Sequence, residues 1–371
     1  MQEIPKTFCP AKWDELLINA ESNMVYSCCK SVPTTIGSGD MLENIKKQRE
    51  NLLNGIQDPA CNYCWLPEKI PGTKSRRHIY LEKMESSDIS KYVDGTANLK
   101  YIELNIGNQC NFQCTYCKPN FSSKWENDVR KKPYKLYTDR FAYEIPKKNK
   151  DVLDKNLKLL EEHKNIHKVT IIGGEPLYNK NFFTLIKHID SKWLGMATNL
   201  SCNKETIDRL INETKKFEHV LVNVSLDATG GIAEFARHGL NFNQWKENFE
   251  YLLKNKPDYM VVQVISLFTS VTVRDIENFA PFMLNYLDQT KWHVSFCIDP
   301  KIQGFSTLPD KYKPAIINCL ESLKSHPVSG LDGVISAIKV SKFNATMHNE
   351  LVSFMNDFAK RKNIEIPICL N

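Results

Sequence analysis

Three cysteines lie within eight residues of one another: Cys110, Cys114 and Cys117. The apolar and β-branched residues of 101–106 (YIELNI) directly before them predict a short strand, and the pattern breaks at Gly107. Three thiolates can hold three irons of a four-iron cluster. The fourth iron is then open to a ligand that is not a protein side chain. The sequence therefore predicts a strand that leads into a cluster-binding loop with one open iron.

The spacing CxxxCxxC, with the aromatic Tyr116 just before the last cysteine, resembles the radical S-adenosylmethionine (SAM) superfamily. A zinc site is one alternative, but zinc normally takes four ligands in paired CxxC or Cys/His spacings. Buried structural thiols are another, and they would not cluster three deep behind a strand. The resemblance implies a catalytic [4Fe-4S] cluster with three cysteine ligands, SAM at its open iron, and Tyr116 among the residues that contact the cofactor.

The overall composition is that of an ordinary globular protein. Of 371 residues, 42% are hydrophobic and 25% are charged, and no apolar run approaches the roughly 18 residues of a membrane span. The first residues lack the basic and apolar segments of a secretory signal, so we expect a cytoplasmic protein with no membrane partner. The net charge of +6 is small for this length and does not argue for nucleic acid as a partner.

A second group of cysteines lies near the N-terminus, in the segments FCP, YSCC and CNYCW. Little secondary structure is predicted there: a strand in MVYSC, and one helix over 40–55 with Asp40 as its N-cap and Gly55 as its stop. So short a segment has too little apolar core to be stable alone, and a metal group bound by four cysteines would stabilise its fold. In a cytosolic context the twelve cysteines of the chain favour metal or sulfur chemistry over disulfides.

The N-terminal segments resemble a twitch domain, the shortened relative of the SPASM domain that carries an auxiliary iron–sulfur cluster. The resemblance implies a second [4Fe-4S] cluster with the ligands Cys9, Cys28, Cys61 and Cys64. The resemblance favours Cys28 over Cys29, and because adjacent cysteines cannot easily both face one metal, Cys29 is expected to be a spectator. A structural zinc site made by the same four thiols is the alternative.

Helix and strand patterns alternate from residue 150 onward. Strands are predicted in KVTII and at 193–198, 219–226, 259–267 and 292–297, with helices at 204–216, 242–254 and 273–287. With 101–106 this makes six βα units. Such units predict an α/β fold, a partial (β/α)6 TIM-like barrel of parallel strands with its chemistry at their carboxyl ends. The expected organisation is an auxiliary-cluster domain at 1–80, the partial barrel at 98–300 and a helical C-terminal extension at 301–371.

One motif at a predicted strand end is Gly173-Gly174-Glu175-Pro176. Two glycines let the backbone approach a ligand closely, Glu175 offers a carboxylate to a cation, and Pro176 fixes the exit path. One strand after the cysteine loop, this resembles the superfamily motif that binds the methionyl amino group of SAM.

Polar side chains follow two further strands. Ser225 and Asp227 are two residues apart, so they face one side of their strand, where they suit the ribose hydroxyls of an adenosyl group. Arg237 has a forked guanidinium that could pair with the SAM carboxylate. Thr198 and Asn199 have a similar position at another strand end. These assignments follow the family resemblance, since a serine in a strand or an arginine on a helix is more often structural.

The last predicted helix carries an apolar stripe at i, i+3, i+4 spacing, which favours packing in the core over the docking of a peptide. The stripe consists of Met347, Leu351, Phe354, Met355 and Phe358. Asp357 and Arg361 on the same helix can pair across one turn.

The resemblance implies that the reduced cluster passes an electron to SAM, and that the resulting 5′-deoxyadenosyl radical takes a hydrogen atom from an unactivated carbon. Relatives with SPASM or twitch domains mostly modify peptides or proteins, so a residue of a ribosomal peptide or protein is the leading substrate, with a flavodoxin or ferredoxin as electron donor. Two alternatives remain: a radical SAM enzyme acting on a small molecule or nucleotide, and a zinc-stabilised binding module without turnover. Cys297, at the end of strand 292–297, is either a small buried thiol or a catalytic residue that returns a hydrogen atom to a substrate radical.

Overall fold

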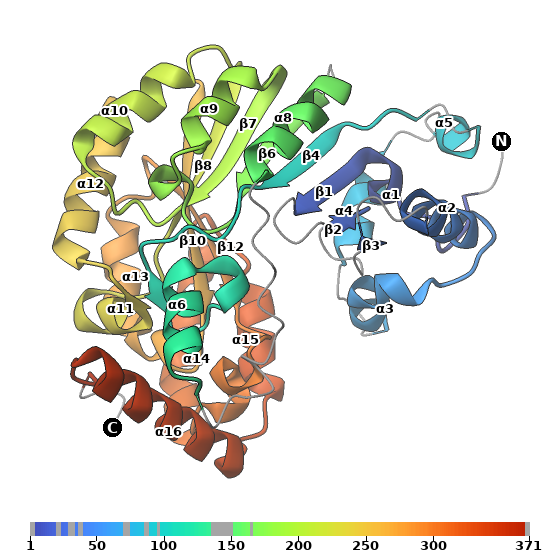
Figure 1. Cartoon of the computed structure of the whole chain (residues 1–371). Helices are drawn as coiled ribbons and strands as arrows, with labels where there is room; N and C mark the ends of the chain where they lie inside the picture. Colours follow the sequence, from blue (N-terminus) through green and yellow to red (C-terminus); the bar gives the residue numbers. More distant parts are fainter. Residues whose placement is uncertain are drawn as a thin grey trace. The chain divides into compact units, whose positions relative to one another are not determined.

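The computed structural model describes residues 4–19, 24–28, 34–35, 40–69, 75–84, 89–94, 97–134, 151–163 and 166–367. The chain forms two compact units (Figure 1). The first comprises Met1–Gly107, Pro146–Gly173 and Thr184–Leu194, and the second comprises Asn108–Ile145, Gly174–Phe183 and Gly195–Asn371. The domain limits expected from the sequence, 1–80, 98–300 and 301–371, stay a prediction.

The strands of the first unit are β1 (Glu15–Asn19), β2 (Met24–Tyr26), β3 (Thr34–Thr35), β4 (Tyr101–Asn105) and β6 (Ile166–Ile172). They lie in the order β3-β2-β1-β4-β6. β4 is parallel to both of its neighbours, with Ile102 opposite Leu16 of β1 and Val169 of β6. β1–β2 and β2–β3 are antiparallel pairs. The strand expected in MVYSC is thus confirmed as β2, whereas β1 has no counterpart among the expected strands.

Seven helices are described wholly or partly in the first unit: α1 (Ala11–Asp14), α2 (Asp40–Leu53), α3 (Asn62–Glu68), α4 (Arg76–Glu82), α5 (Ile89–Val93), α8 (Val152–Glu162) and the end of α9 (Phe182–His188). The helix expected over 40–55 is confirmed as α2, and Gly55 follows its end with a φ of 76°. The side chain of Asp40, the expected N-cap, lies outside the described residues. A small core of Phe8, Trp13 and Tyr92 forms around α1, with ring centroids 5.3–5.8 Å apart.

The second unit has four parallel strands in the order β8-β10-β11-β12. They are β8 (His219–Ser225), β10 (Met260–Phe268), β11 (Lys291–Phe296) and β12 (Val328–Ser329). Strand β7 (Ser191–Thr198) begins in the first unit and ends in the second. The helices α10 (Lys204–Glu213), α12 (Phe242–Asn255) and α13 (Ile276–Leu284) alternate with these strands along the chain. All six strands predicted for the barrel are present, as β4, β6, β7, β8, β10 and β11, and the α/β class with parallel strands is confirmed.

The C-terminal part is helical, with α14 (Lys313–Ser322), α15 (Leu331–Val340) and α16 (Ala345–Lys362). α16 packs against α6 (Ser123–Lys131) in one hydrophobic cluster. The Trp125 ring lies 5.5 Å from Phe358 and 6.2 Å from Phe354, so the apolar stripe lies in the core as predicted. The expected pair of Asp357 and Arg361 is present at 2.8 Å.

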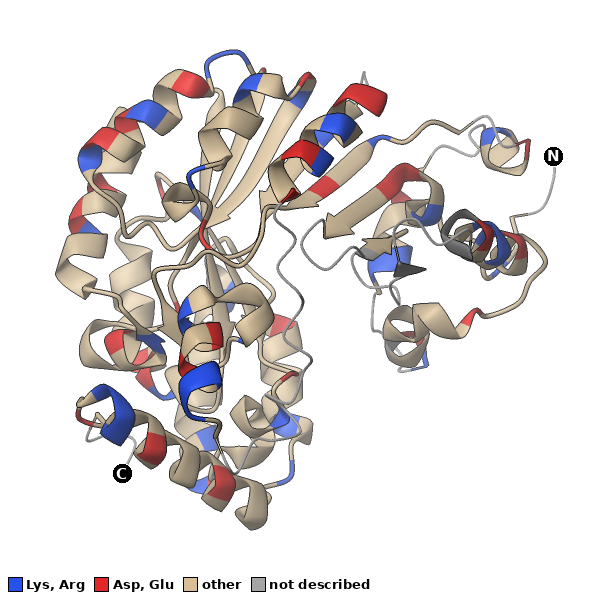
Figure 2. Ribbon diagram, in the orientation of Figure 1, with Lys and Arg blue, Asp and Glu red and all other residues tan. Residues whose placement is uncertain are grey.

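Both signs of charge are interspersed along the outer helices, as Figure 2 shows for α8, α10 and α16. Several of these charges pair across one helical turn, for example Lys158 with Glu162 and Arg209 with Glu213. Within the described part of the chain, no helix combines the length and the apolar character needed to cross a membrane.

Candidate functional site

Side chains of helix α6 form hydrogen bonds with the backbone of the cysteine loop, which lies in the same unit. Its Trp125 indole donates to the Cys114 carbonyl at 2.7 Å, and the Ser123 hydroxyl bonds with the backbone of Cys110 at 3.2 Å. Glu126 accepts from the Asn108 amide at 2.7 Å. Trp125, Glu126 and Asn108 are buried and Ser123 is half-buried, so water cannot easily replace most of these bonds. The loop backbone is therefore fixed by side chains of one helix before any ligand binds.

The three thiols lie in one mutually interacting group, in which Cys110 is buried and Cys114 and Cys117 are half-buried. Burial raises the pKa of Cys110 to about 12 and raises that of Cys114 as well. Cys117 repels the thiolate of each of the other two, which places it close to both. Because metal ligation requires thiolates, a cluster bound here would release protons from these groups.

The loop also pairs with the segment that carries Arg237. Strands β5 (Gln113–Cys114) and β9 (Arg237–His238) form an antiparallel pair in which Cys114 stands opposite Arg237. The Thr115 amide continues the contact by donating to the Ala236 carbonyl at 2.8 Å. The charge of Arg237 opposes the rise that burial causes in the pKa of Cys114. The structure thus brings together two motifs that are separated by about 120 residues in the sequence.

Glu175 lies at the start of a 3-10 helix, η5 (Pro176–Tyr178), and is only 2% exposed. Its carboxylate accepts from the Thr198 hydroxyl at 2.6 Å, the Asn199 amide at 2.5 Å and the Leu177 amide at 3.0 Å. Burial raises its pKa to about 7, and these hydrogen bonds limit the rise. Thr198 and Asn199, predicted beside the cofactor, therefore lie against Glu175.

Gly174 lets the GGEP turn approach the cysteine loop. It has a φ of 47°, and a Cβ at this position would lie 2.2 Å from the carbonyl oxygen of Gln109. The Glu175 amide donates to the same carbonyl at 2.8 Å. Any larger residue at 174 would push the turn away from the loop. Gly173 has a φ of 97°, and Pro176 is buried at the first position of η5.

Asp227, Arg237 and Tyr116 form a buried group beside the loop. Asp227 pairs with Arg237 at 2.8 Å, accepts from the Tyr116 hydroxyl, and accepts from the Leu267 amide at 2.8 Å. Burial alone would lower the pKa of Arg237, but the Asp227 carboxylate raises it well above its usual value. The arginine expected to face a SAM carboxylate is therefore bonded to a carboxylate of the protein. Ser225 is half-buried at the end of β8, paired in register with Ile265.

Cys297 follows β11 and is buried. Its sulfur lies 4.0 Å from the Pro300 carbonyl oxygen. The structure thus places Cys297 in the packed interior of the second unit, and its role as a hydrogen donor stays a prediction.

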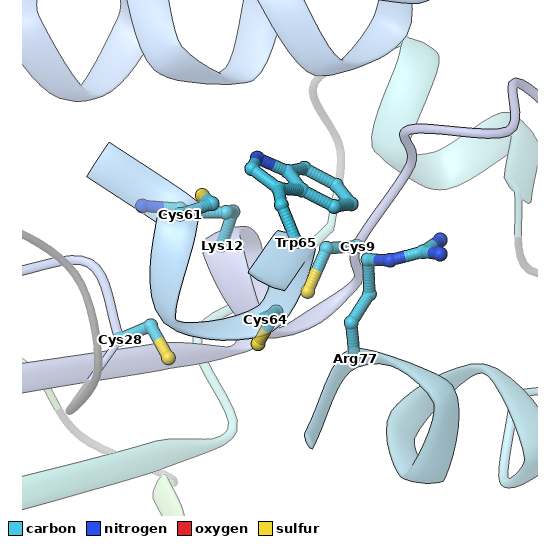
Figure 3. Close-up of a pocket in the computed structure, with 7 residues that line it drawn as sticks. All are labelled: Cys9, Lys12, Cys28, Cys61, Cys64, Trp65 and Arg77. Atoms are coloured by element: carbon cyan, nitrogen blue, oxygen red, sulfur yellow. The ribbon is translucent and has the colours of Figure 1, made fainter. Parts of the chain in front are cut away.

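The N-terminal cysteines line one pocket in the first unit (Figure 3). Cys9, Cys28 and Cys64 are buried and Cys61 is half-buried. Burial raises the pKa of Cys9 to about 12, and thiolates at Cys28, Cys61 and Cys64 would each raise it further. These four thiols are therefore mutual neighbours. Cys29 lies outside the described residues.

Three residues of this pocket were not predicted from the sequence: Lys12, Trp65 and Arg77. Arg77 pairs with Glu68 at 2.6 Å and lies 5.0 Å from the Trp65 ring centroid. The lysine is buried although lysines are mostly exposed, and nothing in its local sequence signals this. Trp65 directly follows Cys64 in CNYCW, and this adjacency is a sequence signal that could have placed Trp65 beside the cysteines.

The donor sets fit iron–sulfur clusters in number and chemistry. Three thiols meet on one loop and four line one pocket, and no disulfide joins any of the ten described cysteines. Thiolates are the usual ligands of such clusters. Within the described ranges, no three or more His, Cys, Asp or Glu side chains already form a group that could hold a metal ion.

Comparison with known proteins gives one family match. Residues 104–283 match the model of the family described as the Radical SAM superfamily. This range contains the cysteine loop, GGEP, Ser225, Asp227 and Arg237.

Curated relatives match about a third of the chain. The GTP 3′,8-cyclase of Nautilia profundicola is 26% identical over 133 residues, which is 35% of this chain and 36% of that protein. The GTP 3′,8-cyclase of Desulforamulus reducens is 26% identical over 133 residues, 35% of each. The chain thus spans about a third of the length of the curated relatives it matches.

Among solved structures, SuiB of Streptococcus suis bound to its precursor peptide SuiA matches with a TM-score of 0.39 and 12% identity, over 87% of this chain and 59% of SuiB. SuiB bound to S-adenosylmethionine matches with a TM-score of 0.41 and 11% identity, over 75% of this chain and 63% of that one.

Proposed function

Because residues 104–283 match the model of the radical SAM superfamily, we propose that this protein is an enzyme that cleaves SAM reductively, with a [4Fe-4S] cluster on Cys110, Cys114 and Cys117. The observation that carries the proposal is the pairing of Cys114 with Arg237 in the β5–β9 ladder. It joins the cysteine loop to the motif expected to bind SAM. The same unit places Glu175 against the loop through the Gln109 carbonyl.

When bound, the cluster supplies the electron that splits SAM into methionine and a 5′-deoxyadenosyl radical, and the radical takes a hydrogen atom from the substrate. The protein's part is to bind and orient. Glu175 accepts from the methionyl amino group, because a carboxylate has about four acceptor sites and three are used by protein donors. Ser225 and Asp227 bind the ribose hydroxyls. Arg237 interacts with the SAM carboxylate through guanidinium N–H groups that Asp227 leaves available.

We further propose that Cys9, Cys28, Cys61 and Cys64 hold an auxiliary [4Fe-4S] cluster. A four-iron cluster offers each thiolate its own iron, so its ligands surround a pocket, as these four thiols do. A structural zinc ion on the same thiols is the alternative, and metal analysis separates the two.

The proposed substrate is a residue of a ribosomal peptide or a protein, with a flavodoxin or ferredoxin as electron donor. The support is the sequence resemblance to twitch and SPASM proteins. A nucleotide or other small molecule is the second candidate, because the curated relatives are named GTP 3′,8-cyclases. Purified enzyme with SAM and dithionite should be assayed for 5′-deoxyadenosine with GTP and with candidate peptides. A rise in 5′-deoxyadenosine with GTP, and none with peptides, would favour the nucleotide.

Iron content and SAM cleavage test the catalytic assignment. Anaerobically reconstituted protein should bind about eight irons, as expected for two four-iron clusters. The triple variant with Cys110, Cys114 and Cys117 changed to alanine should lose about half of that iron and form no 5′-deoxyadenosine. The control Cys319→Ala changes a thiol of α14 and should keep both properties. A triple variant with full iron content and SAM cleavage would contradict the assignment.

A further inference from the structure

Lys12 brings a buried positive charge to the pocket of the four N-terminal cysteines. It lies in α1 and is only 1% exposed. Its ammonium donates to the Ser27 hydroxyl at 2.9 Å and to the Gln48 side-chain oxygen at 2.7 Å. Both acceptors are neutral, so they satisfy hydrogen bonds without balancing the charge. An unbalanced charge in the interior is costly.

The second cation of the pocket is different. Arg77 pairs with Glu68 at 2.6 Å, so its charge is balanced by a carboxylate of the protein. Lys12 forms no ion pair within the described part of the chain. Of the two cations that line the pocket, Lys12 is therefore the one whose charge is not balanced by a carboxylate of the described residues.

The groups of this pocket that can become anions are the thiols of the proposed auxiliary site, and Lys12 lines the pocket together with all four of them. An ammonium has three donors, and Ser27 and Gln48 use two of them. The third is available for a thiolate sulfur. Figure 3 shows Lys12 and Cys61 on the same side of the pocket.

We propose that Lys12 is the counter-ion of the group held by Cys9, Cys28, Cys61 and Cys64, and that it sets the reduction potential of that group. This rests on the auxiliary cluster proposed above. One-electron reduction by a flavodoxin- or ferredoxin-type donor adds one negative charge to the cluster, and no bond forms or breaks. A fixed cation beside a ligand sulfur stabilises the reduced state more than the oxidised one, because net charge and hydrogen bonds to sulfur set the potential.

The test measures the auxiliary cluster alone, in full-length protein with Cys110, Cys114 and Cys117 changed to alanine. Iron content and the midpoint potential, from dithionite titration followed by electron paramagnetic resonance, are compared for Lys12, Lys12→Met and Lys12→Arg. Lys46→Met is the matched control. The Lys46 side chain is 77% exposed on α2, so this substitution removes the same charge from the surface and not from the pocket. Circular dichroism checks that each variant is folded.

We expect Lys12→Met to shift the potential to a more negative value, while Lys12→Arg and Lys46→Met stay close to the parent. Loss of iron in Lys12→Met with retention in Lys12→Arg also supports a counter-ion. An unchanged potential in Lys12→Met with full iron would overturn the inference, as would loss of iron in both Lys12 variants, which indicates packing. If the parent protein binds no second cluster, the auxiliary-cluster proposal fails together with this inference, while SAM cleavage by the wild type still tests the catalytic proposal separately.

Discussion

At the scale of single residues, Glu175 is the carboxylate that we propose to bind the amino group of SAM, so its charge state should affect SAM affinity. It is 2% exposed, and burial raises its pKa from the usual 4.5 to about 7 despite hydrogen bonds from Thr198, Asn199 and Leu177. Below that pH the group is protonated and neutral. Above it the group is a carboxylate that can attract the ammonium of SAM. We therefore expect the affinity of this site for SAM to change in the neutral range of pH.

We predict that SAM affinity rises with pH through about 7 and then levels off. Glu175→Gln should weaken binding by roughly 1.5–3 kcal/mol at pH 8, about ten- to a hundredfold in Kd, because a charge-assisted hydrogen bond is lost. It should also flatten the pH profile between 6 and 8. Equilibrium binding of SAM to anaerobic protein measures both. Glu205→Gln, an exposed change on α10, is the control; a pH profile of Glu175→Gln that matches wild type would remove Glu175 from the SAM site.

Residue types and spacing predicted which side chains belong to this site, but not how they pair. Cys110, Cys114 and Cys117 are recognisable because a short local spacing defines them. The bond between Asp227 and Arg237 depends on helix α11 (Gly230–Ala236), which lies between β8 and β9, and the sequence predicted SAM as the partner of both residues. Lys12 gave no signal, because its burial depends on α2, which lies about 30 residues further along the chain and supplies Gln48.

At the scale of elements, helix α6 is the link between the cysteine loop and the C-terminal helix. One face of α6 donates and accepts hydrogen bonds to the loop, for example from Trp125 to the Cys114 carbonyl. Its apolar side chains pack on α16 in a shared cluster. Helical spacing in the sequence predicted the apolar stripe of α16. It did not predict that the stripe packs against α6, because α6 is about 230 residues away in the sequence.

Phe358→Ala should therefore destabilise the protein by about 3–5 kcal/mol, because its ring is fully buried against Trp125 and Phe235. Val352→Ala on the same helix is the control. Val352 is 37% exposed, and a surface substitution of this kind costs about 0.5 kcal/mol or less. Guanidinium unfolding followed by circular dichroism gives both values. Equal losses in the two variants would mean that α16 does not pack through Phe358.

Some strands were predicted from the sequence and one was not. β8, β10 and β11 were predicted within about one residue at each end, because runs of β-branched and apolar residues mark them. β1 was missed. Its sequence ELLIN follows AKWD without a turn residue, and alternation over five residues is too short to separate strand from helix. Its pairing with β4 on one side and with β2 on the other makes it a strand.

At the scale of the whole molecule, the chain holds two groups of thiols, and each lies within one compact unit. Cys110 and Cys114 are tied to α6 by hydrogen bonds that need no metal. The N-terminal thiols are held by short elements, of which α1 has four residues and α3 seven. Short helices are marginal by themselves, so we expect a metal group bound by these thiols to contribute more to the order of this region.

We predict that Cys61→Ala/Cys64→Ala removes about four of eight irons and loosens residues 1–75, while the cluster on the loop persists. Increased cleavage near the N-terminus in limited proteolysis, with 5′-deoxyadenosine still formed from SAM, would be the combined signature. Cys28→Ala should reduce iron in the same way and Cys29→Ala should not, because two adjacent cysteines cannot easily face one cluster. One zinc per chain in the wild type, without a second iron–sulfur signal, would instead assign these thiols to a structural zinc site.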